Sequence, residues 1–263
     1  MLNLPELINK LKAHRNVDAV FLTGSYGEGS KPYSDIDLVI ILRKNDLGLT
    51  SLYTWIDHKF ADVFFFDHSV LARIETVQEL SGNDMDAVLV SWLQKAIIKF
   101  DKSGQITDLS KRIDQLTDKI TVSKIDRYQF WQKINYNLVA NTRYFESNDP
   151  DYLKALEVRL LYSVSEVFTG YFSLRGLVWR GEKEAIKYLQ QYDKKFYGSF
   201  IAYTQTSTLQ EKFGHYIDLV NLVFPRGYQK WKTGDVFFQP KQQEKANSNK
   251  GLKFWKEITG SDK

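Results

Sequence analysis

The hydrophobic pattern changes about 110 residues into the chain, and this change constrains the fold class more than any other feature. Before it, short apolar segments such as IDLVIIL at residues 36–42 and FADVFFFD at 60–67 have the length and the β-branched or aromatic content of buried strands. After it, residues 126–146 and 151–175 carry apolar side chains at the helical period of 3.6. The sequence therefore predicts an α+β protein, with a mixed β-sheet and its helices followed by a helical bundle.

A chain of 263 residues is long enough for two domains. We predict a mixed sheet domain at 1–115, a helical domain at 116–238 and a tail at 239–263, whose polar composition indicates a flexible segment. Between residues 49 and 60 the apolar side chains recur at helical spacing, which predicts a helix in that part of the first domain.

Composition and charge exclude several classes of protein. The chain has no cysteine, which rules out disulfides, thiolate metal sites and a cysteine nucleophile. Its net charge of +4 comes from residues 225–263, with 9 Lys and Arg against 4 Asp and Glu, whereas residues 1–115 carry 13 against 16. This distribution disfavours nucleic acid as a partner, because a nucleic-acid groove needs basic residues on the folded body. No segment resembles a signal peptide or a membrane span, so we expect a cytoplasmic protein without membrane contact.

The stretch TGSYGEGSKPYSDIDLVI, residues 23–40, carries two aspartates into an apolar strand. Because alternate residues of a strand face the same way, Asp35 and Asp37 are expected on one face, about 7 Å apart along the backbone. Carboxylates held this close repel each other unless a cation lies between them. Mg²⁺ is bound in proteins by one or two carboxylates together with substrate phosphates, so the pair predicts a magnesium site.

The glycine-rich loop before the aspartates adds a phosphate site to this prediction. Gly24 permits a sharp turn and a close approach of phosphate oxygens to the backbone. Ser25 supplies a hydroxyl group, together with backbone N–H groups if a short helix begins there. The loop lacks the G-K-S/T ending of a Walker motif. Together, the loop and the aspartates predict a site for a nucleoside triphosphate with magnesium.

A third carboxylate is expected on a neighbouring strand, because two-metal phosphoryl transfer needs a ligand on the far side of the metal pair. The segment FADVFFFD offers Asp62 and Asp67, which are five residues apart and therefore face opposite sides of a regular strand. Asp67 immediately precedes a helical pattern, where the role of helix N-cap explains it. We therefore select Asp62 and keep Asp67 as the alternative.

The order of Gly24 and Ser25, then Asp35 and Asp37, then a later Asp62 resembles the DNA polymerase beta-type nucleotidyltransferase superfamily. The helical second half and the pieces YSDIDLVIIL, ADVFFFD and IIKFDKSGQI resemble bacterial aminoglycoside and lincosamide nucleotidyltransferases. The resemblance implies an N-terminal nucleotidyltransferase domain that transfers a nucleoside monophosphate, with ATP as the expected donor, to a hydroxyl group. It also implies two Mg²⁺ ions held by the three aspartates, with the nucleotide bound at the glycine-serine turn.

The helical domain is expected to supply the acceptor site. On the helix predicted at 151–175, Arg159 and Glu166 lie on a polar stripe and are candidate acceptor-binding residues, although ion pairing on a helix face also explains them. The expected acceptor is a hydroxyl-bearing small molecule, such as an aminoglycoside, a lincosamide or another hydroxylated compound. The chain is expected to act as a monomer or a homodimer.

Three other functions fit parts of the pattern. The first is nucleotidylation of a protein partner, as in toxin–antitoxin pairs, although the large helical half indicates a built-in acceptor site. The second is nucleotide addition to RNA, which the nearly neutral body disfavours. The third is nucleotide binding without catalysis, which the three intact aspartates argue against.

Overall fold

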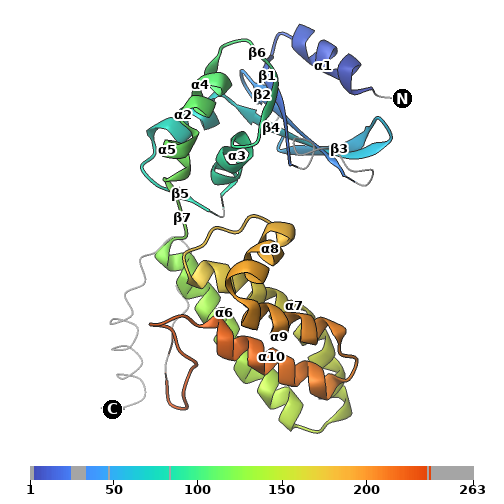
Figure 1. The fold of residues 1–263 in the computed structure, drawn as a ribbon, viewed down its shortest axis with the longest axis vertical. Coiled ribbons are helices and arrows are strands. Elements are labelled where there is room, and N and C mark those ends of the chain that lie inside the picture. The colour runs from blue at the N-terminus through green and yellow to red at the C-terminus, as the bar shows by residue number, and fades with distance from the viewer. Residues whose placement is uncertain (1–2, 25–33, 47, 83, 236, 238–263) are drawn as a thin grey trace. The chain divides into compact units, whose positions relative to one another are not determined.

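The computed structural model describes residues 3–24, 34–46, 48–82, 84–235 and 237. The chain divides into two compact units, Met1–Thr121 and Val122–Lys263, which are described here one at a time (Figure 1). The predicted combination of a mixed sheet with helices and a following helical region is confirmed. None of the helices in the described ranges has the length and apolar character needed to cross a membrane.

The first unit contains a five-stranded sheet in the order β3-β4-β2-β1-β6. The strands β2 and β4 run parallel, and the other neighbouring pairs are antiparallel. The short strands β5 and β7 form a separate parallel pair. The strands of the unit are β1 (Val17–Thr23), β2 (Ile36–Leu42), β3 (Ser51–Ile56), β4 (Lys59–Asp67), β5 (Leu80–Ser81), β6 (Ile97–Asp101) and β7 (Ile120–Thr121). The helices are α1 (Leu4–Ala13), α2 (His68–Thr76), α3 (Met85–Leu93), α4 (Gln105–Lys111) and α5 (Ile113–Thr117).

Both faces of the central strands β1 and β2 are buried, which explains why these strands are nearly continuous apolar runs. On one face Phe21, Val39 and Ile41 pack with buried residues of α2 to α5. On the other face Leu38 and Ile40 belong to a second cluster that includes residues of α1 (Figure 1). Because side chains alternate along a strand, Asp37 shares its face with Val39 and Ile41, the face that carries α2 to α5.

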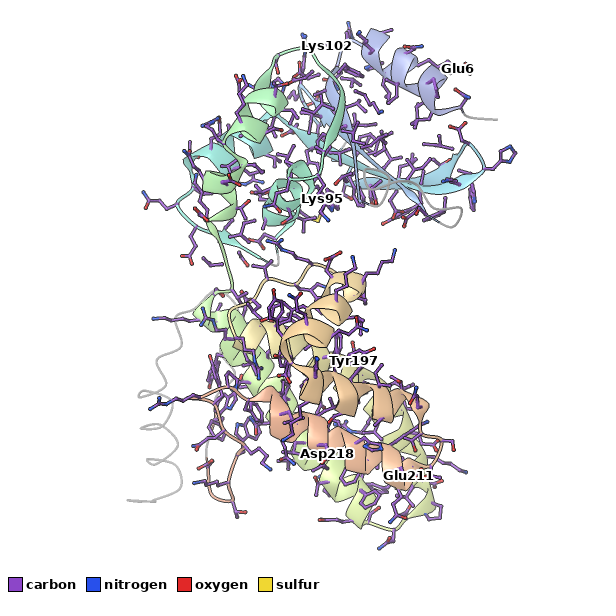
Figure 2. The ribbon with its side chains drawn as sticks, viewed as in Figure 1. Glu6, Lys95, Lys102, Tyr197, Glu211 and Asp218 are labelled. Carbon is purple, nitrogen blue, oxygen red and sulfur yellow. The ribbon has the colours of Figure 1, made fainter. Side chains whose placement is uncertain are left out.

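A buried charge lies near the start of β1. Asp18 is 2 % exposed, and the pairing of β1 with β2 shifts register at this position, as in a β-bulge. Its carboxylate accepts a hydrogen bond from the Ser103 hydroxyl and lies 3.2 Å from His68 Nε2. Nearby, Lys102 donates hydrogen bonds to the carbonyls of His14 and Val17 (Figure 2). Ser103 and His68 compensate for the cost of burying the Asp18 carboxylate.

The prediction of a helix between residues 49 and 60 is wrong, because this segment contains the strand β3. Leu52, Thr54 and Ile56 alternate with Tyr53 and Trp55, and the strand pairs antiparallel with β4. Large side chains on both faces conceal the two-residue period, so the apolar residues match helical spacing by chance. This strand is an edge of the sheet, and it brings the two aromatic side chains close to β4.

The second unit is helical in its described residues, as predicted. Its elements are α6 (Lys124–Glu146), α7 (Pro150–Leu174), α8 (Glu182–Tyr192), α9 (Lys194–Gln205) and α10 (Leu209–Val223). Helix α7 begins with Pro150, and the Asp149 side chain accepts hydrogen bonds from the first backbone N–H groups, which explains the sharp restart after α6. Glu211 accepts hydrogen bonds from the hydroxyls of Thr206 and Thr208 at the start of α10 (Figure 2).

Candidate active site

Two of the predicted site residues occupy paired positions on neighbouring strands. Asp37 of β2 lies directly beside Asp62 of β4 in the parallel register, and Thr23 of β1 pairs with Asp37. On the far side, Tyr53 of β3 pairs with Asp62. We call these four residues the carboxylate row; they cross four strands and share one face, because paired residues of a sheet point to the same side.

The third predicted aspartate lies just outside the sheet. Asp35 immediately precedes β2 and, like Asp37 and Asp62, is partly buried. Burial is the first cause that raises the pKa of Asp62, and the negative charge of Asp35 is the second. One carboxylate oxygen of Asp62, Oδ1, is buried and receives no hydrogen bond from the described residues. A carboxylate in this position is short of a donor or a cation.

Gly24 packs against Asp37. A Cβ atom built on Gly24 would lie 2.0 Å from Asp37 Oδ2, and the residue has a φ of +67°. Both facts require glycine, since no side chain fits the gap and the left-handed conformation disfavours other residues. The backbone of Gly24 thus lies close to the Asp37 carboxylate, and the role of Gly24 in binding a nucleotide stays a prediction. Ser25, the other predicted nucleotide-binding residue, lies outside the described residues.

Asp67, the alternative third carboxylate, serves α2 as its N-cap. Its Oδ1 accepts hydrogen bonds from the backbone N–H groups of Ser69 and Val70 and from the Ser69 hydroxyl. The side-chain hydrogen bond from Ser69 is the main cause that lowers the pKa of Asp67. These bonds occupy Asp67 in helix capping and favour Asp62 as the third carboxylate, which stays a prediction.

The residues present fit a hard cation with a bound nucleotide better than a closed metal cage. In the part of the chain that the structure describes, no three Asp, Glu or His side chains are gathered closely enough to hold a metal ion by themselves. Magnesium, however, is usually bound by one or two carboxylates, with the remaining positions filled by water and substrate phosphates. The paired Asp37 and Asp62, with the Oδ1 atom of Asp62 lacking a partner, match that requirement.

Sequence reasoning missed Thr23 and Tyr53, the two ends of the carboxylate row. Thr23 is buried, and its hydroxyl donates to the carbonyl of Trp92 at 3.1 Å, which ties the end of β1 to α3. Tyr53 is 63 % exposed. The strand register places it beside Asp62, and no spacing in the sequence reveals that register.

The predicted acceptor residues Arg159 and Glu166 belong to a hydrogen-bonded network between α6 and α7. Arg159 Nη2 donates to Asn137 Oδ1 at 2.9 Å, and Asn137 in turn donates to Glu166. Arg159 Nε also donates to Asn141, which donates to Ser163. Burial raises the pKa of Glu166. Both residues therefore have partners within the helical unit, and their role toward an acceptor stays a prediction.

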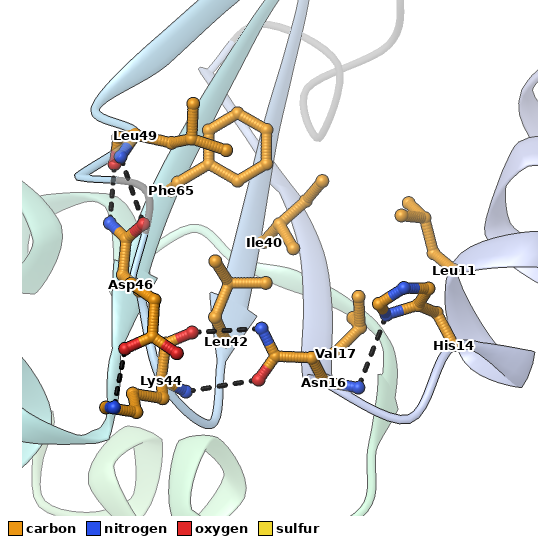
Figure 3. A pocket seen from close by; sticks show the side chains of 11 residues that line it. Leu11, His14, Asn16, Val17, Ile40, Leu42, Lys44, Asp46, Leu49 and Phe65 are labelled. Atoms are coloured by element: carbon orange, nitrogen blue, oxygen red, sulfur yellow. Dashed lines mark hydrogen bonds and ion pairs between the residues drawn. The ribbon is translucent and has the colours of Figure 1, made fainter.

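A cavity of about 390 Å³ lies on the opposite face of the sheet (Figure 3). Its apolar wall includes Ile40 and Leu42, which alternate with the residues that share the face of Asp37. The polar side chains of the cavity wall bond to each other. The Asn16 side chain donates a hydrogen bond to the Lys44 carbonyl and accepts one from the Lys44 N–H, and Lys44 Nζ lies 2.6 Å from Asp46. The cavity is therefore separate from the carboxylate row.

A mixed sheet that presents paired carboxylates beside a tight glycine turn defines a class of nucleotide-processing protein. The family model described as "Nucleotidyltransferase domain" matches residues 4–138, more than half of the chain. The chain belongs to this family and is a nucleotidyltransferase, as the sequence predicts. The narrower resemblance to aminoglycoside and lincosamide enzymes stays a prediction.

The other comparisons add little to this result. No curated protein matches the chain. Among solved structures, the chain is similar to a nucleotidyltransferase-like protein from Exiguobacterium sibiricum, with 13 % sequence identity and a TM-score of 0.44. The similarity covers 83 % of this chain and 72 % of that chain.

Proposed function

We propose that this nucleotidyltransferase transfers a nucleoside monophosphate, from ATP as the expected donor, to a hydroxyl group of a small molecule. The register pairing of Asp37 with Asp62 carries the proposal, because it sets two carboxylates side by side with one oxygen atom in need of a partner. Gly24 lies close to the Asp37 carboxylate. These features support a single site at which the triphosphate and the acceptor hydroxyl bind next to each other.

The reaction balances with the groups that the chain supplies. A bond forms between the acceptor oxygen and the α-phosphorus atom, the bond from that phosphorus to the bridging oxygen breaks, and pyrophosphate leaves. The Asp62 carboxylate accepts the proton of the acceptor hydroxyl, because burial raises the pKa of its carboxyl group. Asp35, Asp37 and Asp62 would together hold two Mg²⁺ ions. When bound, Mg²⁺ stabilises the charge of the transferring phosphoryl group and lowers the pKa of the attacking hydroxyl.

The acceptor class follows from the resemblance to aminoglycoside and lincosamide nucleotidyltransferases. The test incubates the full chain with labelled ATP, GTP, CTP or UTP, Mg²⁺, and a panel of aminoglycosides and lincosamides, and measures pyrophosphate release. We expect release that needs both an acceptor and the metal, and that stops when EDTA is added. Release without any dependence on an acceptor would contradict the proposal.

Transfer to a protein is the competing outcome of the same test. Mass spectrometry of the chain and of proteins that co-purify with it distinguishes the two acceptors. A nucleotide mass added to a small molecule supports the proposal. A nucleotide mass found solely on a protein would replace it.

A further inference from the structure

Three exposed aromatic side chains lie together at the β3 end of the carboxylate row. Tyr53, Trp55 and Phe60 form this aromatic patch and have exposed fractions of 63 %, 64 % and 43 %. The Tyr53 and Phe60 rings stack with their centroids 6.3 Å apart and their planes 4° apart. Trp55 meets Phe60 edge-on at 5.7 Å. Contiguous exposed aromatic surface of this kind is unusual in a protein without a binding role at that place.

Strand pairing fixes the patch on the same face as the proposed catalytic carboxylates. Tyr53 is the register partner of Asp62, and Trp55 is the register partner of Phe60, which lies two residues before Asp62. Residues two apart in a strand share a face, so all three rings lie on the side of Asp62. Directly opposed residues have Cβ atoms about 5 Å apart, which places the patch within one small-molecule length of Asp62.

The order of the strands indicates which substrate this patch would meet. Gly24 directly follows β1, Asp37 lies on β2, Asp62 on β4 and the patch on β3 and the start of β4, in the spatial order of the sheet. The triphosphate is expected near Gly24, and the proposed function has Asp62 face the attacking hydroxyl. The side of Asp62 that points away from Gly24 is therefore the side available to the acceptor.

We infer that the aromatic patch binds the acceptor, and that the acceptor is a hydroxylated ring compound such as a pyranoside. This inference rests on the proposed function. The apolar face of a sugar ring can lie flat on Trp55 or Tyr53 while a ring hydroxyl points to Asp62. An amino substituent on the ring would be stabilised further by the aromatic faces and by the nearby carboxylates.

The test measures binding by saturation-transfer difference NMR with the full chain, irradiating aromatic protons. The probes are kanamycin A and lincomycin, with glycerol as the acyclic control. The variants are Trp55→Ala and Tyr53→Ala, with Tyr192→Ala as the matched control, because Tyr192 is 65 % exposed on α8 of the other unit. Binding of ATP with Mg²⁺ is measured in parallel by calorimetry.

We expect at least one ring-bearing probe to bind the natural chain, and its dissociation constant to rise at least tenfold in Trp55→Ala and Tyr53→Ala. It should change less than twofold in Tyr192→Ala, and the ATP dissociation constant should change less than twofold in all variants. Trp55→Phe keeps a ring and should recover most of the affinity. All three substituted side chains are exposed, and thermal melts confirm that each of the four variants is folded.

Other results would overturn the inference. If Trp55→Ala and Tyr53→Ala lost ATP affinity as strongly as probe affinity, the patch would bind the nucleobase. If these variants instead changed the molar mass of the protein in solution and left probe binding unchanged, the patch would be a self-association surface. Failure of both ring-bearing probes to bind the natural chain would also overturn it. If the natural chain bound a probe but no ATP in the presence of Mg²⁺, the proposed function itself would fall, which is a distinguishable result.

Discussion

Asp37 and Asp62 are register partners on the parallel strands β2 and β4, so their carboxylates leave the sheet on the same side and at the same level. Two like charges in this position destabilise each other unless a cation joins them. Under the proposed function, a bound Mg²⁺ would compensate this repulsion.

The roles of Asp62 and Asp67 can be separated with two matched substitutions on one strand. Asp62→Asn should lower the rate of nucleotide transfer at least 100-fold, because it removes both a proton acceptor and a negative charge. Asp67→Asn should leave the rate within about threefold, since asparagine caps a helix about as well as aspartate does. Steady-state pyrophosphate release measures both variants. Full activity of Asp62→Asn with a loss in Asp67→Asn would exchange the two roles.

Gly24→Ala should abolish transfer, whereas Gly48→Ala should not. Both glycines have positive φ values, +67° and +62°, so each substitution costs about 1–2 kcal/mol of backbone strain. The new methyl group collides with Asp37 at Gly24, whereas at Gly48 no described residue other than the chain neighbours lies within 4 Å of a Cβ. Urea unfolding measures the shared strain, and pyrophosphate release measures the specific effect. Equal activity of the two variants would contradict the packing of Gly24 against the carboxylate.

Asn141→Ala should destabilise the helical unit by about 1–3 kcal/mol, because it leaves buried partners unsatisfied. Asn141 is fully buried and links Arg159 to Ser163. Thr142→Ala, at the neighbouring position of α6, is the control. Adding Ser163→Ala to Asn141→Ala should cost less than the sum of the single changes, since the two residues share a hydrogen bond. Additive costs measured by urea unfolding would contradict this coupling.

Glu166→Gln should make the protein more stable relative to the natural chain as the pH rises above about 4.5. Burial raises the pKa of Glu166 in the folded state, so the unfolded chain releases this proton first. The stability contributed by the protonated form is complete below the unfolded pKa and is lost as the pH rises through the folded pKa. Glutamine keeps an oxygen for Asn137 and has no proton to lose.

Urea unfolding at a series of pH values from 5 to 8 measures the difference between Glu166→Gln and the natural chain. Glu157→Gln is the matched control, because it removes the same charge from an exposed position on the same helix. A difference that shrinks with rising pH would contradict the stated direction of the pKa shift.

The sequence predicts the strands β2 and β4 and the long helices because their signals are local. Asp67 is a good example, since an aspartate directly before a helical pattern indicates its own role as a cap. The strand β3 was wrongly predicted as helix, because an edge strand with large side chains on both faces has no visible alternation.

What the sequence could not predict depends on contacts between distant segments. The pairing of Tyr53 with Asp62 depends on strand register, and the aromatic patch depends on that pairing. Asn137 and Asn141 do leave a signal, since two asparagines four residues apart lie on one face of α6. Their partners on α7 depend on how the two helices pack together, which the sequence pattern does not reveal.

The pairing of β2 with β4 also determines how the site can fail on heating. Hydrogen-bonded strands cannot slide by fractions of a residue, and a slip of one residue would turn Asp37 toward the opposite core. The backbone hydrogen bonds thus prevent a gradual misalignment of the two carboxylates. We expect the site to keep its geometry up to the temperature at which the sheet melts, and activity to be lost in the same cooperative transition.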